Sequence, residues 1–158
     1  FLGYSIGSAP IISFHYGAKN SSELKNLFKK SLSLIGSWGI MLFVIAQLIA
    51  GPLAKLFVGY NADLFLITKH GFQIFCFAFL INGFNIFGSS FFTALNNGLI
   101  SAAISFLRTL VFQLSVVLIL PMILGINGIW ISVAIAELLT LCVTVTCLIR
   151  KRKVYHYI

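Results

Sequence analysis

The sequence has 158 residues, of which 59% are hydrophobic and only 9% are charged, and its mean hydropathy is +1.04. Soluble domains typically carry about 25% charged and about 45–50% apolar residues, so this chain has too few charges to cover a water-exposed surface. These values exclude a soluble enzyme, a disordered tail and a DNA-binding domain, and they indicate an integral membrane protein.

The net charge of +8 comes from eleven Lys and Arg residues against three acids, Glu23, Asp63 and Glu137. The basic residues stand in short clusters between long apolar runs, which is typical of anchors at an anionic membrane surface and not of nucleic-acid binding. The three cysteines lie inside apolar runs and lack the spacing of a disulfide framework or a metal site. We therefore expect small core residues and no bound metal or cofactor.

The start of the chain indicates a fragment. The first residue is Phe1, and no basic segment precedes the first apolar run, so a signal peptide is not indicated. We expect the chain to be part of a longer protein and to begin inside a hydrophobic helix.

Apolar stretches long enough to cross a membrane follow one another along the chain, since about 20 mostly apolar residues span a hydrocarbon core of about 30 Å. The uncharged run 70–107 would be about 57 Å long as a single helix, so the turn signal Asn96-Asn97-Gly98 is predicted to divide it. Two further spans are predicted to end near Gly51-Pro52 and around Pro121 and the Gly125-Ile126-Asn127-Gly128 turn. The sequence predicts an all-α polytopic membrane bundle with four complete transmembrane helices and part of a fifth, at residues 1–18, 31–54, 65–94, 99–122 and 129–149.

Basic residues alternate between the predicted connections. The even-numbered connections hold only Lys55 and Lys69. Because basic loops face the cytoplasm, the odd connections and the C-terminus are predicted to be cytoplasmic, in a multi-pass protein of the plasma or inner membrane. The odd connections and the tail hold the other nine basic residues: Lys19, Lys25, Lys29, Lys30, Arg108, Arg150, Lys151, Arg152 and Lys153.

The segment 21–30 before the second span is amphipathic, with Leu24, Leu27 and Phe28 at helical spacing. It is either a helix lying in the membrane interface or a cytoplasmic extension of the span that follows.

The predicted helix 65–94 carries a polar stripe at steps of three and four residues. Polar side chains within a membrane usually face protein or a water-filled cavity. The stripe therefore lines a substrate path or forms hydrogen bonds between packed helices. Its members are Asn82, Asn85, Ser89, Thr93 and Asn96.

Glu137 is the one acid inside a predicted span, near its middle, with Thr140 and Thr144 on the same face. Desolvation favours the neutral form of such a carboxyl group, which would allow it to carry a proton in coupled transport. The alternative is a structural carboxyl group that bonds a neighbouring helix or pairs with Arg108. Such a pair requires favourable helix rotation, because the predicted depths of the two residues differ by about 8 Å.

The sequence contains no nucleotide-binding loop and no pairing of a nucleophile with a base, so no enzyme activity is predicted. His15 and His70 lie near predicted membrane interfaces without an acidic or Cys partner nearby in sequence. We expect them to be anchors or packing groups.

Three short motifs, which begin at Pro10, Ala94 and Gly128, together resemble the multidrug and toxic compound extrusion (MATE) family. The segment Pro-Ile-Ile-Ser-Phe-His-Tyr-Gly-Ala-Lys-Asn, from Pro10 through Gly17 and Ala18 to Asn20, is similar to the family signature at the cytoplasmic end of a helix. The segment Ala94-Leu95-Asn96-Asn97-Gly98 resembles the turn before the penultimate helix. Gly128-Ile129-Trp130, leading to Ala136-Glu137, resembles the start of the last helix.

The resemblance implies a twelve-helix transporter with two six-helix lobes, of which this chain would form most of the C-terminal one. Its partners would be the N-terminal lobe, the lipid bilayer and small organic cations. Family members export cationic or amphiphilic compounds in exchange for protons or sodium ions by alternating access. Sodium-coupled members carry a carboxylate on the helix that matches 65–94, where this chain has only amides and hydroxyls; Ala9 also replaces a glutamine frequent before the signature proline.

Two other functions remain compatible with the sequence. A flippase for lipid-linked saccharides, from a related branch, would need a strongly cationic cavity, for which Arg108 is the available intramembrane residue. A non-transporting membrane scaffold would use every polar intramembrane residue for helix packing.

Overall fold

The computed structural model describes residues 1–157, and all secondary structure in this part of the chain is helical. A 3-10 turn (Cys76–Ala78) joins α3 to α4, and a π-helical segment (Leu107–Gln113) joins α5 to α6. The predicted all-α class is thus confirmed. The α-helices are α1 (Leu2–Gly17), α2 (Ser21–Val58), α3 (Ala62–Phe75), α4 (Phe79–Ala94), α5 (Gly98–Phe106), α6 (Leu114–Leu124) and α7 (Ile126–Tyr155).

Four helical rods are long and apolar enough to cross a membrane: Ser21–Val58, Ala62–Ala94, Gly98–Leu124 and Ile126–Tyr155. At 1.5 Å per residue the 16-residue α1 is about 24 Å long, which is shorter than a hydrocarbon core. The prediction of four complete spans and part of a fifth is therefore confirmed.

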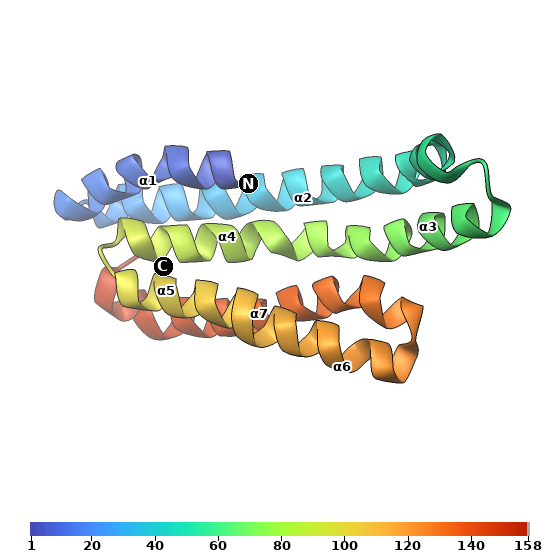
Figure 1. Ribbon diagram of the computed structural model, residues 1–158. Helices are drawn as coiled ribbons and strands as arrows, with labels where there is room; N and C mark the ends of the chain where they lie inside the picture. The colour runs from blue at the N-terminus through green and yellow to red at the C-terminus, as the bar shows by residue number, and fades with distance from the viewer. Residues whose placement is uncertain (158) are drawn as a thin grey trace.

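The rods run alternately up and down, and α4 lies at the centre of the bundle (Figure 1). It contacts α1 and α2 on one side and α5 and α7 on the other, while α3 continues it alongside α2. Polar side chains of α4 can therefore reach several helices, which makes it the element that organises the site.

The helix end predicted near Gly51-Pro52 is wrong, whereas the end predicted around Pro121 and the Gly125 turn agrees with the end of α6. Pro52 lies inside α2, which continues to Val58, and Pro121 lies inside α6, which continues to Leu124. A proline removes one helical hydrogen bond, and neighbouring helices in a membrane bundle compensate for that loss. The turn between α6 and α7 is Gly125 alone, whose φ of 59° is the left-handed conformation that glycine adopts without strain, so α7 begins at Ile126.

The amphipathic segment 21–30 is the first part of α2 and continues without interruption into the membrane span. Asn20 caps this helix by accepting a hydrogen bond from the Glu23 N–H at 3.2 Å. Leu24 and Phe28 are buried against the other helices. Of the two predicted arrangements, the extension of the span is the one observed.

One end of the bundle carries most of the positive charge. The α1–α2 connection, the α4–α5 connection and the C-terminal end of α7 lie together there (Figure 1), and we call it the basic end. The opposite end holds Lys55 and Lys69. Arg108, which the charge count grouped with the third connection, lies inside the predicted span 99–122, ten residues beyond Gly98 and about 15 Å along the rod.

An aromatic core closes the basic end. Phe28, Phe87, Phe91 and Tyr157 are all buried, and the Phe28–Phe91 and Phe91–Tyr157 ring centroids are 4.9 and 5.0 Å apart. Such aromatic contacts fix the ends of α2, α4 and α7 relative to one another.

Candidate functional site

The polar stripe of α4 divides into two groups that contact different neighbours. Asn82 and Asn85 face a charged pair formed by the π-helical segment and α7. Ser89 and Thr93 face hydroxyl groups of α5. Asn96 lies beyond the helix in the connection to α5, with a left-handed φ of 59°, and is exposed.

Arg108 and Glu137 form an ion pair within the membrane-spanning part of the bundle. The Arg108 Nη2 and Nε groups both donate to Glu137 Oε1, at 2.6 and 2.9 Å. Glu137 is 5% exposed, and the Arg108 side chain keeps 27% exposure. Charge-assisted hydrogen bonds to one carboxylate oxygen offset part of the cost of burying both ions.

Amide groups of α4 complete this arrangement, which we call the charged network: Asn82, Asn85, Arg108, Glu137 and Thr144. Asn82 Oδ1 accepts a hydrogen bond from Arg108 Nη2 at 2.6 Å. Asn85 Nδ2 donates to Glu137 Oε2 at 2.7 Å, and Thr144 Oγ1 donates to Asn85 Oδ1 at 3.1 Å. Both carboxylate oxygens of Glu137 therefore have donors, from two different helical rods.

A π-helical segment places Arg108 in this network. Residues Leu107–Gln113 form π-helix between α5 and α6, whereas the rest of the rod is α-helical. π-Helical turns in α-helices occur often at functional sites, because the extra residue per turn changes the direction in which side chains point. The π-helical segment thus contains Arg108, which is the one basic residue of the rod Gly98–Leu124.

The second group joins α4 to α5 through hydroxyls. Ser89 Oγ lies 2.9 Å from both Ser101 Oγ and Ser105 Oγ, and Thr93 Oγ1 lies 2.6 Å from Ser101 Oγ. Sequence reasoning missed Ser101 and Ser105. Together with Arg108 they follow steps of four and three, the same helical spacing that identified the stripe on α4, so the signal was present.

A cavity of about 280 Å³ lies beside both groups, between α1, α4 and α5. The Ser5 side chain in its wall is 2% exposed, and its hydroxyl has no hydrogen-bond partner among residues 1–157. A buried hydroxyl without a partner beside an open space is available to a ligand or a water molecule. Polar lining residues are Ser5, Ser89, Ser90, Thr93, Ser105 and Arg108; apolar ones are Leu2, Ile6 and Ile86.

The family-signature residues lie away from the charged network. Pro10 is exposed inside α1, while Gly17 and Ala18 form the end of α1 at the basic end. His15 also lies near this end, and His70 is exposed in α3 near the opposite one. Among the described residues, no group of three His, Cys, Asp or Glu side chains is arranged to hold a metal ion.

Comparisons with known proteins identify the family. The MatE family model matches residues 1–119, and no curated protein shows a significant match to the sequence. The crystal structure of the Vibrio cholerae MATE transporter VcmN in the bent form is similar, with a TM-score of 0.82 and 19% identity over 96% of this chain. The match covers 35% of the VcmN chain, so this chain spans about a third of that protein's length. The predicted resemblance is confirmed: the chain belongs to the MATE family, whose members are membrane transporters and not enzymes.

Proposed function

We propose that the protein containing this chain is a secondary active exporter of cationic or amphiphilic organic compounds, driven by exchange for protons or sodium ions. The chain supplies most of the C-terminal lobe of a twelve-helix carrier, which works by alternating access together with the N-terminal lobe. Its basic end lies in the cytoplasm, since basic residues are retained on that side of the membrane.

The observation that carries this proposal is the charged network in the middle of the bundle. Ionisable side chains within a membrane are costly, and they commonly mark ion or substrate pathways. Here Glu137 of α7 and Arg108 of the π-helical segment are bridged by two amides of α4. The hydrogen bonds join three rods, so a change in the charge of Glu137 acts on the packing of all three.

Glu137 is the residue that we propose to load the coupling ion. A proton on Glu137 removes its negative charge and weakens the bonds from Arg108 Nε and Nη2. The guanidinium then interacts less with α7 and is available to the adjacent cavity, which it already lines. Arg108 donates to one Glu137 oxygen and Asn85 to the other, so a proton or a sodium ion would compete with these donors for the carboxylate.

The substrate path, in this proposal, follows the cavity between α1, α4 and α5. Ser89 and Thr93 line that cavity, whereas Asn82 and Asn85 bond the charged pair. We therefore assign the first two to substrate contact and the amides to positioning of Arg108 and Glu137. The pairing of Arg108 favours an antiporter over a saccharide flippase, which would need unpaired positive charge for a pyrophosphate.

The test is efflux of a fluorescent lipophilic cation from cells expressing the full-length protein, with the proton and sodium gradients collapsed separately. Efflux that stops when one gradient is collapsed supports the antiporter and identifies its coupling ion. Absence of efflux under every gradient contradicts the proposal and directs attention to lipid-linked substrates.

The role of Glu137 is tested with Glu137→Gln, which keeps the side-chain volume and removes the charge. We expect gradient-driven efflux to be lost while the protein remains folded in the membrane. Glu23→Gln is the matched control, because Glu23 is exposed at the basic end. Its carboxylate accepts a hydrogen bond from Asn26, and its backbone N–H donates to the capping residue Asn20. Normal efflux by Glu137→Gln contradicts coupling through this residue and leaves it a structural role.

A further inference from the structure

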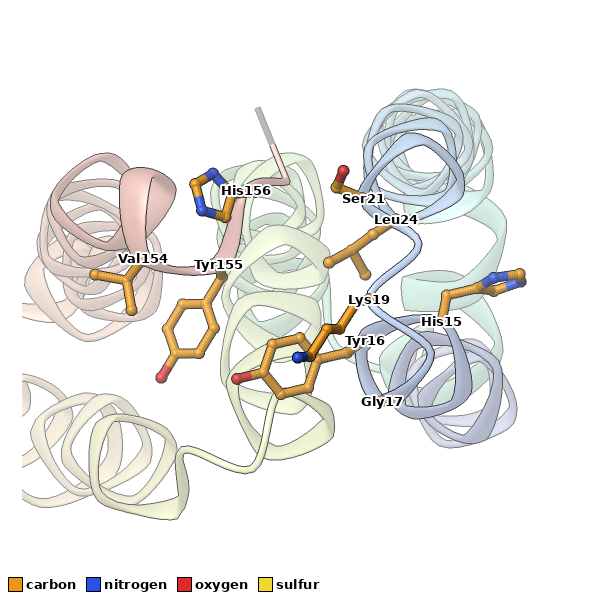
Figure 2. Close-up of a pocket in the computed structure, with 9 residues that line it drawn as sticks. All are labelled: His15, Tyr16, Gly17, Lys19, Ser21, Leu24, Val154, Tyr155 and His156. Atoms are coloured by element: carbon orange, nitrogen blue, oxygen red, sulfur yellow. The ribbon is translucent and has the colours of Figure 1, made fainter.

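A second cavity, of about 470 Å³, lies at the basic end and takes no part in the charged network (Figure 2). One wall is the α1–α2 connection, from Tyr16 to Leu24, and the other is the end of α7, from Val154 to His156. The side chains of Tyr16, Lys19 and Tyr155 extend into the space between these two segments, while the His15 side chain points away from it (Figure 2).

The lining of this cavity is largely apolar, but its polar side chains include hydrogen-bond donors and one lysine, and none of the described residues that line it is acidic. Lys19 supplies an ammonium group, and Tyr16 and Ser21 supply hydroxyls. The Tyr155 hydroxyl accepts a hydrogen bond from Asn97 Nδ2 at 2.7 Å, so its own proton is free to be donated elsewhere. A group with several acceptor oxygens and a negative charge matches this set of donors.

Both walls are held in place by contacts outside the cavity. The Lys19 and Asn20 amides donate to the Tyr16 and His15 carbonyls at 3.1 and 3.0 Å, which fixes the α1–α2 connection. On the other side, Tyr157 is fully buried and donates to the Leu148 carbonyl at 2.6 Å. The cavity is therefore formed before any ligand binds, which reduces the entropic cost of binding.

The surroundings of the cavity resemble a membrane interface. Tyr16 and Tyr155 pack edge to face, with ring centroids 5.6 Å apart, at the end of the membrane-spanning rods. Tyrosine is enriched at that depth, where its ring lies among lipid headgroups. Four consecutive basic residues, Arg150–Lys153, precede the α7 wall directly, and Leu24 and Val154 add apolar surface to the cavity.

We propose that this cavity binds the phosphate group of an acidic phospholipid, with Lys19 and the hydroxyls of Tyr16, Ser21 and Tyr155 contacting the phosphate oxygens. The apolar Leu24 and Val154 side chains contact the glycerol and the first methylenes of the lipid. The site shares no lining residue with the cavity proposed as the transport path, so lipid binding can be tested independently of the antiport activity.

The experiment measures the thermal midpoint of the full-length protein in nanodiscs of phosphatidylcholine with increasing phosphatidylglycerol. We expect a saturable rise in the midpoint for the unchanged protein. For Lys19→Gln the half-saturating fraction of phosphatidylglycerol should increase about fivefold, which corresponds to about 1 kcal/mol for one basic residue at an anionic surface. Lys19→Arg keeps the charge, so its half-saturating fraction should stay close to that of the unchanged protein. Tyr155→Phe removes one hydroxyl, so its half-saturating fraction should increase.

Lys25→Gln is the matched control, since it removes the same charge from the same end but does not line the cavity. An equal loss for Lys25→Gln and Lys19→Gln contradicts a defined site and indicates a diffuse basic surface. Unchanged titrations for both Lys19→Gln and Tyr155→Phe also overturn the proposal. A parallel titration with inorganic phosphate in pure phosphatidylcholine identifies the source: stabilisation that depends on Lys19 there supports the phosphate chemistry but assigns it to the free anion.

Discussion

The Asn85 amide nitrogen donates to two acceptors of Glu137 at once, the side-chain Oε2 at 2.7 Å and the main-chain carbonyl at 2.8 Å. This single contact joins the central helix α4 to α7 at the level of the ion pair. It also orients the carboxylate, because Oε2 is held by Asn85 and Oε1 is left to Arg108. Asn85 is completely buried, so no water molecule is available to replace it.

Replacing Asn85 with Leu should destabilise the protein by about 1–3 kcal/mol, the usual cost of leaving buried polar groups without partners. Both Glu137 acceptors and the Thr144 hydroxyl lose their bond to this side chain. The measurement is the thermal midpoint of the full-length protein in detergent. Asn26→Leu serves as the control because Asn26 is exposed, and equal midpoints for the two variants would contradict the packing role of Asn85.

The Arg108–Glu137 pair should show strong coupling in a double-mutant cycle. Removing one partner of a fully buried pair typically costs about 3–5 kcal/mol, because the other charge is left uncompensated, and the 27% exposure of Arg108 reduces that cost here so that each single variant still folds. Arg108→Gln and Glu137→Gln should each destabilise the protein, and the double variant should lose much less than the sum of the two. Additive losses in unfolding free energy would show that the two side chains do not depend on each other.

Gly88 allows α4 to approach α7 closely. A Cβ atom at position 88 would overlap the Thr144 Cγ2 methyl group. Gly88→Ala should therefore destabilise the protein by about 1–3 kcal/mol, the usual cost of overpacking. Thr144→Ser removes that methyl group and keeps the hydroxyl that bonds Asn85, so it should make Gly88→Ala tolerable.

Gly98→Ala is the control for that substitution, since no atom lies within 4 Å of the added Cβ there. Thermal midpoints of the four variants provide the comparison. If Thr144→Ser does not rescue Gly88→Ala, the overlap with Thr144 is not the cause of the loss.

The hydroxyls of the cavity between α1, α4 and α5 should influence which compounds are exported. Thr93→Val keeps the shape of the side chain and removes its hydroxyl, which bonds Ser101. We expect a change in the relative efflux of dyes with and without hydrogen-bonding groups, at unchanged protein abundance. Thr146→Val is the control, because Thr146 is exposed and bonds only the Cys142 carbonyl of its own helix. A loss of abundance for Thr93→Val with an unchanged substrate profile would indicate helix packing instead.

Tyr157 gives the basic end a sensitivity to alkaline pH. Burial raises the pKa of the Tyr157 hydroxyl well above its usual value, and the neighbouring Cys147 and Tyr155 raise that pKa further. The folded state thus favours the neutral phenol. The stabilisation from Tyr157 is complete below about pH 10, the pKa of an unfolded tyrosine, and is lost as the pH rises toward the folded-state pKa.

The measurement that checks this compares unfolding midpoints of the unchanged protein and Tyr157→Phe between neutral and alkaline pH. Tyr157→Phe keeps the ring contacts with Phe28 and Phe91 but lacks the hydrogen bond to the Leu148 carbonyl. Its midpoint should therefore be lower at neutral pH, and the difference should narrow above about pH 10. A difference that stays constant with pH would show that Tyr157 does not ionise on unfolding.

Some properties of the protein follow from local sequence. The number, order and approximate limits of the helices depend on the lengths of apolar runs and on turn residues such as Asn96-Asn97-Gly98, which act over a few residues. For the same reason Pro52 misled the prediction: it weakens a helix locally, but the surrounding bundle keeps α2 helical as far as Val58.

The composition of the candidate site was decided by the tertiary structure. The sequence left the pairing of Arg108 with Glu137 as one of two alternatives and treated the polar stripe of α4 as one surface. In the structure Arg108 bonds both Glu137 and Asn82, and the stripe divides between two partners. Which side chains meet depends on the rotation and depth of each helix relative to its neighbours. Those are set by non-local packing, such as the contact of Gly88 with Thr144, which no periodicity within a single helix encodes.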